Sequence, residues 1–83
     1  MKMENGHKFT VKEIRNGKKE VVDSIIITDD RDKSQLLADM VSYYDDPQYN
    51  RMWDSDKRGV RISNSDGDGY YIYYRQCGVV TQD

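Results

Sequence analysis

Alternating apolar residues near the start of the chain predict a β-hairpin. The apolar positions of its first strand are Phe9, Val11 and Ile14. Asn16-Gly17 follows, and both positions of a type I′ turn need a positive φ, which these two residues tolerate. The return strand is expected over about residues 18–28. Its triplet Ile25-Ile26-Ile27 suits a strand that is packed on both faces or is central in a sheet.

A helical repeat follows the hairpin. The apolar residues that mark one helix face are Leu36, Leu37, Met40, Val41 and Tyr44. Thr28-Asp29-Asp30 offers oxygen atoms for the N-cap. Pro47 disfavours helix at the residue before it, so the helix should stop near Asp45-Asp46. A short second helix is expected to run from Pro47 through Trp53.

A second hairpin is expected to complete the fold. Val60 and Ile62 begin its first strand, residues 64–69 turn, and residues 70–75 form its second strand, with an extension through Val79 and Val80. The order predicts an α+β domain: a small antiparallel sheet of two hairpins with one main helix on one face. Residues 1–83 form a single domain on this interpretation, and about residues 1–7 are expected to be flexible.

Charge is distributed unevenly along the chain. Its 83 residues are 36% hydrophobic and 34% charged, which predicts a lean core under a polar surface. The net charge of −2 divides into +3 over residues 1–22, −6 over residues 23–56 and +1 over residues 57–83. This imbalance bears on partners rather than on fold.

Several kinds of chemistry lack their sequence signals. Cys77 is the single cysteine, so no intrachain disulfide can form, and no signal peptide precedes the domain, which indicates a cytoplasmic protein. The longest apolar run, Ile25-Ile26-Ile27, is far shorter than a membrane span. His7 is the only histidine and is expected in solvent. No phosphate loop or paired-cysteine metal motif is present. We therefore expect no enzyme activity, cofactor or metal centre.

One turn partly matches a calcium loop. Asn64, Asp66, Asp68 and Gly69 occupy the first, third, fifth and sixth positions of an EF-hand loop, but the bidentate glutamate of the twelfth position is replaced by Arg75. The flanks also have strand patterns. A hairpin turn that uses residues tolerant of positive φ is the favoured interpretation, and weak calcium binding is the alternative.

Acidic residues recur along the predicted helix. Asp32, Asp39 and Asp46 are seven residues apart, so two helical turns bring each nearly above the last. No Lys or Arg lies between residues 34 and 50 to neutralise this edge. An ordinary solvated helix face explains the pattern, and an acidic stripe that docks onto a basic surface is the functional hypothesis.

The last predicted strand is rich in tyrosine. Side chains alternate between the two faces of a strand, so Tyr70, Ile72 and Tyr74 should pack under the helix. The opposite, open face should then carry Tyr71, Tyr73 and Arg75, with Arg61 across the hairpin. Cross-strand packing explains such residues, but Tyr and Arg also dominate interface hot spots, and aromatic side chains beside arginines suit stacking on single-stranded nucleic acid.

The chain resembles, in general appearance, small phage- or prophage-encoded inhibitor proteins such as anti-CRISPR proteins. The likeness rests on the length, the Asn16-Gly17 hairpin, the helix with uncompensated acids and the tyrosine-rich last hairpin. It implies a non-catalytic inhibitor that blocks a larger host protein or nucleic-acid-handling complex. We expect the partner to be a protein with a basic surface, contacted by Asp32, Asp39, Asp46, Trp53, Tyr71, Tyr73 and Arg75.

Two alternatives to this hypothesis stay open. The first is a single-stranded nucleic-acid-binding domain that uses the aromatic sheet face. It is less favoured because the overall charge is slightly negative and phosphate binding usually needs a clear basic excess. The second is a subunit that forms a homo-oligomer through its last strand.

Overall fold

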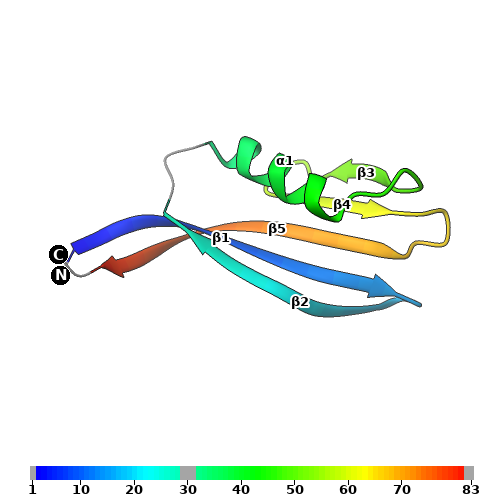
Figure 1. Cartoon of the computed structure of the whole chain (residues 1–83), viewed down its shortest axis with the longest axis horizontal. Coiled ribbons are helices and arrows are strands. Elements are labelled where there is room, and N and C mark those ends of the chain that lie inside the picture. Colours follow the sequence, from blue (N-terminus) through cyan, green and yellow to red (C-terminus); the bar gives the residue numbers. More distant parts are fainter. Residues whose placement is uncertain (1, 29–31, 82–83) are drawn as a thin grey trace.

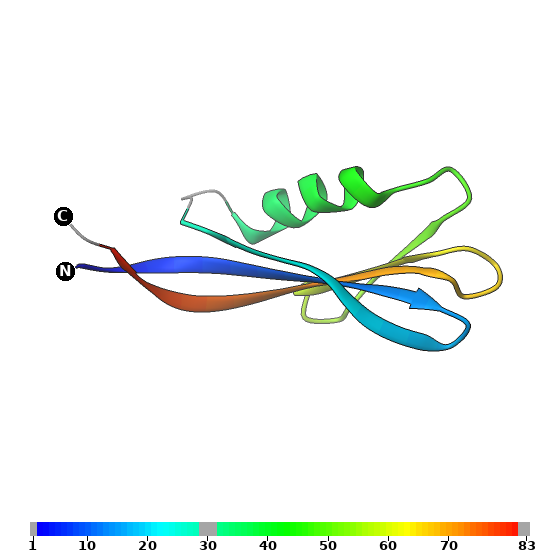
Figure 2. The same cartoon turned by 60° about the horizontal axis from the view of Figure 1, so that its bottom comes forward.

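The protein folds as a five-stranded antiparallel sheet with one helix on one face, an α+β arrangement (Figures 1 and 2). The computed structural model describes residues 2–28 and 32–81. Its elements are β1 (Lys2–Arg15), β2 (Lys18–Ile27), α1 (Lys33–Tyr44), β3 (Asn50–Trp53), β4 (Gly59–Ser63) and β5 (Gly69–Thr81). The strand order is β2-β1-β5-β4-β3, so the two longest strands lie side by side in the middle.

The core lies between α1 and the sheet face that it covers. Its buried residues come from both layers: Phe9, Val11, Leu36, Leu37, Val41, Val60, Ile62, Ile72 and Tyr74. α1 packs mainly over β5 and β4. The helical repeat in the sequence is confirmed, because its apolar positions are the ones that face the sheet. Within the described residues, no helix is long and apolar enough to cross a membrane.

The first hairpin forms as predicted. Asn16 and Gly17 have φ angles of 53° and 78°, which are the positive values that a type I′ turn requires. Phe9 pairs with Ile25 across β1 and β2. The helix ends at Tyr44 and Asp45 is its C-cap, as the position of Pro47 predicts.

The N-terminal end of α1 differs from expectation. Asp32 occupies the N-cap position, in extended conformation and without a side-chain capping hydrogen bond. Of the expected capping residues, Asp29 and Asp30 lie outside the described residues.

The predicted second helix is wrong. Residues 46–49 make a single turn, in which the amide of Tyr49 donates to the carbonyl of Asp46 over 2.9 Å. Residues 50–53 then form the edge strand β3, where Trp53 pairs with Val60 of β4. The edge of β4 forms backbone hydrogen bonds with residues 50–53. A helix as short as the predicted one is only marginally stable in isolation, so the strand is favoured. The sheet is therefore larger than two hairpins.

The predicted central position of the isoleucine triplet is also wrong. β2 is an outer strand, and Ile26 exposes 56% of its surface on the open face. β1 has β5 as its other neighbour, which places β2 at the edge of the described sheet.

Residues 2–7, for which the sequence predicts flexibility, form the first part of β1. Lys2 to His7 pair with residues 76–81 of β5, so the ends of β1 and β5 project together as a two-stranded ribbon (Figure 1). His7 is half-buried rather than solvated, and its Nδ1 lies 2.9 Å from the hydroxyl of Tyr74. This long pairing contributes to the elongated shape of the molecule, 48 × 22 × 21 Å.

Candidate functional site

The three predicted acidic positions do not form one helix stripe. Asp32 is the N-cap of α1, Asp39 lies within the helix, and Asp46 lies beyond its C-terminal end. The Asp46 carboxylate accepts a hydrogen bond from the amide of Gln48 at 2.9 Å, so it stabilises the turn after the helix. Asp39 is the one member that the helix itself presents.

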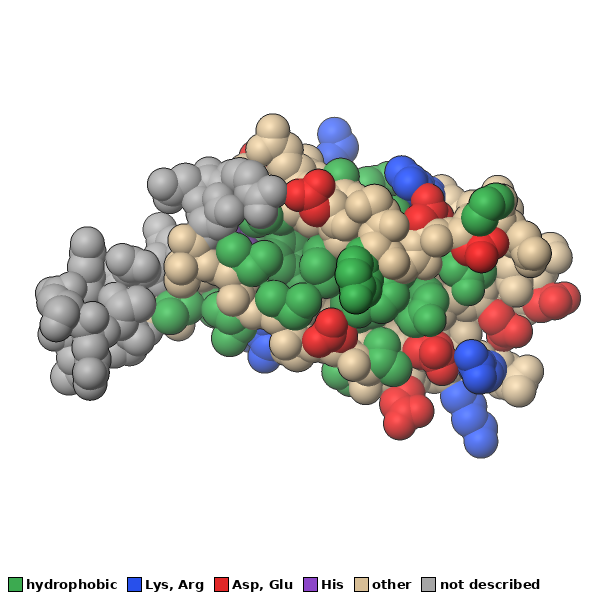
Figure 3. Space-filling model, viewed as in Figure 1, with side chains coloured by type: hydrophobic (Ala, Val, Ile, Leu, Met, Phe, Trp, Pro, Cys, Tyr) green, Lys and Arg blue, Asp and Glu red, His purple; other side chains and the backbone are tan. Residues whose placement is uncertain are grey.

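An apolar groove with acidic borders lies between α1 and β2. The residues of this groove, called here the acidic groove, are Asp23, Ile25, Asp39, Met40, Tyr43 and Tyr44. It exists because α1 lies over β5 and β4 and leaves the helix-side residues of β2 only partly covered. Figure 3 shows hydrophobic side chains gathered between the two elements with acidic side chains around them. Tyr43 is the most exposed large apolar side chain of the acidic groove, at 82%.

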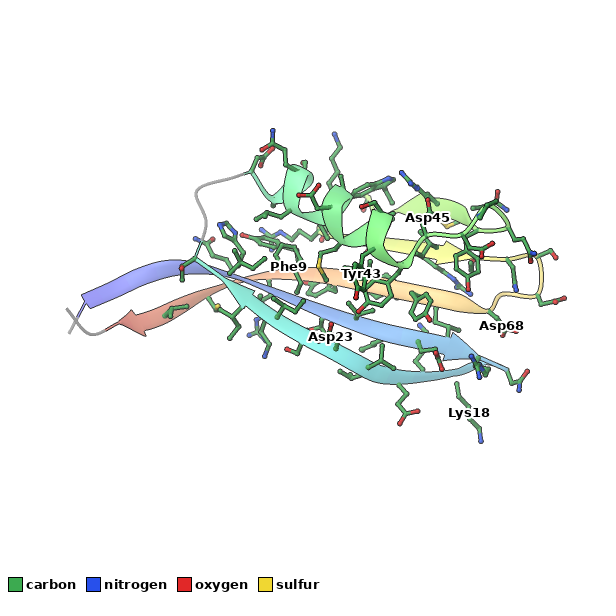
Figure 4. The ribbon with its side chains drawn as sticks, in the orientation of Figure 1. Phe9, Lys18, Asp23, Tyr43, Asp45 and Asp68 are labelled. Atoms are coloured by element: carbon green, nitrogen blue, oxygen red, sulfur yellow. The ribbon has the colours of Figure 1, made fainter. Side chains whose placement is uncertain are left out.

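One wall of the acidic groove is held by a hydrogen bond. The Tyr44 hydroxyl donates to Oδ2 of Asp23 over 3.0 Å, and this bond joins α1 to β2. Burial and the neighbouring Asp23 carboxylate raise the pKa of the Tyr44 phenol to about 12. The ring of Tyr43 packs edge-on against Tyr44, with centroids 5.2 Å apart. Figure 4 shows Asp23 and Tyr43 on the two elements that form the groove.

Trp53 lies on the helix side of the sheet, at its opposite edge. Its cross-strand partner Val60 is buried in the core, whereas Trp53 is 42% exposed. Together with Ser34 and the β3–β4 connection it borders a second, mostly apolar hollow. Trp53 therefore belongs to the same side of the molecule as the acidic positions.

The open face of the sheet carries the predicted tyrosines. Tyr71, Tyr73 and Arg75 point away from α1, while Ile72 and Tyr74 are buried beneath it; the predicted division of the strand is confirmed. Arg61 is the cross-strand neighbour of Tyr71, as expected. The seven predicted contact residues thus divide between two opposite faces.

The register of β1 against β5 adds cations that the sequence did not assign to a site. Lys8 pairs with Arg75 and Lys12 pairs with Tyr71. The resulting depression, called here the open-face platform, is lined by Lys8, Thr10, Lys12, Tyr71, Tyr73 and Arg75. The alternation of Phe9 and Val11 with polar residues shows that these lysines avoid the core, but only the long-range register places them beside the tyrosines.

A hydrogen bond from Tyr71 to Asp54 anchors the platform. The Tyr71 hydroxyl donates to Oδ2 of Asp54, which follows β3. Burial and this carboxylate raise the pKa of the Tyr71 phenol far above its usual range. The ring of Tyr71 lies nearly parallel to that of Tyr73, at 15° with centroids 6.3 Å apart.

The turn after β4 uses its polar atoms internally. Oδ1 of Asn64 accepts hydrogen bonds from the amides of Asp66 and Asp68, each at 3.0 Å. Oδ1 of Asp68 accepts the amide of Asn16 in the other hairpin, also at 3.0 Å. Gly67 has a φ of 85°. This geometry supports the hairpin interpretation. Across residues 2–28 and 32–81, no group of three or more His, Cys, Asp or Glu side chains could hold a metal ion.

Comparison of the chain with protein-family models, with curated proteins and with solved structures finds no match. The two faces therefore have to be interpreted from their own chemistry.

Proposed function

We propose that the protein is a non-catalytic protein-binding module that receives a basic, partly apolar surface of its partner in the acidic groove. The observation that carries this proposal is the combination of an exposed apolar wall, including Tyr43, with the carboxylates of Asp23 and Asp39 at its borders. An apolar patch with a polar rim is typical of a protein interface. The carboxylates would select basic partners and accelerate their encounter.

The groove is built to bind without rearrangement. The Tyr44–Asp23 hydrogen bond and the edge-on packing of Tyr43 against Tyr44 order the wall before any partner arrives. Ordered side chains lose less entropy on association, so more of the contact energy appears as affinity. Tyr43 supplies a large contact area with few rotatable bonds, which is a property of interface anchors.

Burial supports the non-catalytic part of the proposal. No charged side chain whose burial is described is fully buried. A carboxyl group that acts as a general acid near neutral pH usually needs burial to raise its pKa. Asp23 instead accepts hydrogen bonds from Tyr44 and from its own neighbour Ser24, which is a structural use of its two oxygens.

Inhibition is the form of binding that the proposal favours. A small chain with a preformed acidic surface can block the basic groove of a larger host protein or nucleic-acid-handling complex by occupying it, as its likeness to small phage-encoded inhibitors implies. A cytoplasmic location, inferred from the single cysteine, belongs to the same proposal. Asp32 and Asp46 lie beyond the two ends of the helix and extend the acidic surface.

Parallel affinity capture tests the proposal. Wild-type protein, Tyr43→Ala and Asp39→Lys are immobilised in equal amounts and exposed to the same bacterial host lysate. We expect a basic protein to be retained by the wild type and lost from both variants. Tyr73→Ala is the matched control, because it removes an equally large aromatic side chain from the opposite face and should retain that protein.

The direct affinity of the captured protein then decides the outcome. We expect Tyr43→Ala to weaken binding by about 1–2 kcal/mol, as truncation of an interface anchor does, while circular dichroism shows an unchanged fold. Equal affinity of wild type, Tyr43→Ala and Asp39→Lys for every captured protein would disprove the acidic groove as the binding surface.

A further inference from the structure

The open-face platform concentrates positive charge on two adjacent central strands. Its cations are Lys8 and Lys12 on β1 and Arg75 on β5. Lys8 and Arg75 are direct cross-strand partners on the same face, although like charges in this position destabilise a sheet. No ion pair joins any of the three to a carboxylate among the side chains that the structure describes. A bound anion would remove the repulsion between them.

The tyrosines of the platform form a regular aromatic surface between these cations. Tyr71 and Tyr73 are two residues apart on β5, so their rings project side by side, and they lie within 15° of parallel. Tyr71 is fixed by Asp54, and Tyr73 is 37% exposed. Parallel rings on a strand, one partly exposed at Tyr71 and one exposed at Tyr73, offer flat surfaces on which planar groups can stack.

The overall charge of −2 does not describe the field at this face. The acidic side chains of the α1 region, Asp39 and Asp46 among them, lie on the opposite side of the sheet. Among the described side chains, Asp54 and Asp56 are acidic neighbours of Tyr71. The half that contains Lys8, Tyr73 and Arg75 is therefore the more positive one, and a local basic patch can attract a polyanion whatever the net charge.

We propose that the open-face platform binds single-stranded nucleic acid. Unpaired bases stack on Tyr73 and Tyr71, while the sugar–phosphate backbone follows Lys8, Lys12 and Arg75. A duplex keeps its base faces inside the helix, so only its phosphates can contact the platform. RNA and DNA strands share the chemistry that this surface recognises. The platform lies on the sheet face opposite to the acidic groove, so this activity is independent of partner binding there.

Fluorescence anisotropy with labelled oligonucleotides tests this proposal. The probes are an oligo-dT, an oligo-U and a DNA duplex of equal length, each titrated with the full chain over a range of salt concentrations. Both single strands should bind more tightly than the duplex. Contacts with three phosphates predict a log–log salt slope of about −2, since each contact on a single strand contributes about −0.7.

Two substitutions separate stacking from phosphate contact. Tyr73→Ala should weaken single-strand binding about tenfold or more and leave the salt slope unchanged, whereas Tyr73→Phe should bind like the wild type. Lys12→Gln should reduce the slope by about 0.7. Lys18→Gln is its matched control, because it removes the same charge from an exposed position at the start of β2 and should change the slope less.

Several results would overturn the proposal. One is the absence of binding to either single strand at low salt. A second is single-strand binding that Tyr73→Ala leaves unchanged, and a third is equal binding of duplex and single strands. Either of these results would indicate a general attraction of polyanions to surface lysines. Tyr43→Ala, in the acidic groove, serves as the control for the other face: it should leave oligonucleotide binding unchanged whether or not the protein-binding proposal holds.

Discussion

Tyr71 and Asp54 form their hydrogen bond directly over Gly59. A Cβ atom added at Gly59 would meet the Tyr71 hydroxyl, the Tyr71 ring and Oδ2 of Asp54 at separations that real Cβ atoms do not reach. Gly59 is buried and begins β4. The absence of a side chain at this position therefore lets a loop carboxylate reach across the sheet and fix the position of an aromatic ring on the open face.

Gly59→Ala should destabilise the protein. The new methyl group has to displace either the Tyr71 ring or the Asp54 carboxylate, and overpacking of this kind costs about 1–3 kcal/mol. The free energy of unfolding in urea measures it. In a Tyr71→Phe background the hydroxyl is gone, so the same substitution should cost less by about 0.5 kcal/mol or more. Equal costs in the two backgrounds would show that the pair does not constrain Gly59.

Local sequence patterns were sufficient for the elements whose partners are near in sequence. The first hairpin depends on Asn16-Gly17, whose positive φ angles are a property of those two residues. The helix depends on a repeat that brings Leu37 and Val41 to one face. The division of β5 into a buried and an open face follows from strand alternation alone. These features were correctly predicted because no distant contact is needed to specify them.

The remaining features depend on long-range pairing. β3 replaces the expected second helix because β4 offers an edge, and β2 is an outer strand because β1 pairs with β5. Both facts require the whole sheet. For the same reason the site was only half predicted: the tyrosines were assigned to a surface, but the lysines opposite them were not, since the pairing of Lys12 with Tyr71 joins residues far apart in sequence.

The Tyr44–Asp23 pair predicts a stability loss at high pH. The Tyr44 phenol has a pKa raised from 10.0 to about 12 by burial and by Asp23. Between these values the unfolded chain releases the proton and the folded chain keeps it, so stability is complete below about pH 10 and falls as pH rises towards 12. Several phenols have raised pKa values, Tyr71 among them, so phenolate absorbance followed against pH should show more than one late transition. The one that belongs to Tyr44 should be missing in Tyr44→Phe.

Asp23→Asn provides the test of the cause. Removal of the negative charge should lower the pKa of Tyr44 towards its usual value, and the late transition should move to lower pH. An unchanged transition in Asp23→Asn, with the fold intact, would mean that burial alone raises the pKa of this phenol.

The ion pair between Asp45 and Arg51 predicts an effect in acid. A nitrogen of the Arg51 guanidinium lies 2.5 Å from Oδ2 of Asp45, and this contact lowers the pKa of the carboxyl below its usual value. A lowered pKa contributes stability above the unfolded-state value and loses it as pH falls through the folded-state value. The urea midpoint of the wild type should therefore fall more steeply between neutral pH and about pH 3 than that of Arg51→Gln.

A double-mutant comparison isolates this pair. Asp45→Asn and Arg51→Gln should each remove the same acid-dependent part of the stability, and the double variant should remove no more than either one. Because the pair is partly exposed, high salt should reduce its effect in the wild type. Additive losses in the double variant would indicate that the two side chains act through other neighbours.

The bond from Asn16 to Asp68 predicts that the two turns of the sheet stabilise each other. The Asp68 carboxylate accepts the amide of Asn16 over 3.0 Å, and Asp68→Ala should lower the free energy of unfolding by about 0.5–1.5 kcal/mol. Asp66→Ala is the matched control in the same turn, because its carboxylate accepts no hydrogen bond from the described residues. The free energy of unfolding of this variant should stay within about 0.5 kcal/mol of wild type.

The same turn is expected not to bind calcium. Since Asn64 and Asp68 already accept hydrogen bonds from backbone amides, calcium should leave the melting temperature of the protein unchanged. A calcium-dependent rise in melting temperature that Asp66→Ala and Asp68→Ala both abolish would establish the turn as a cation site instead.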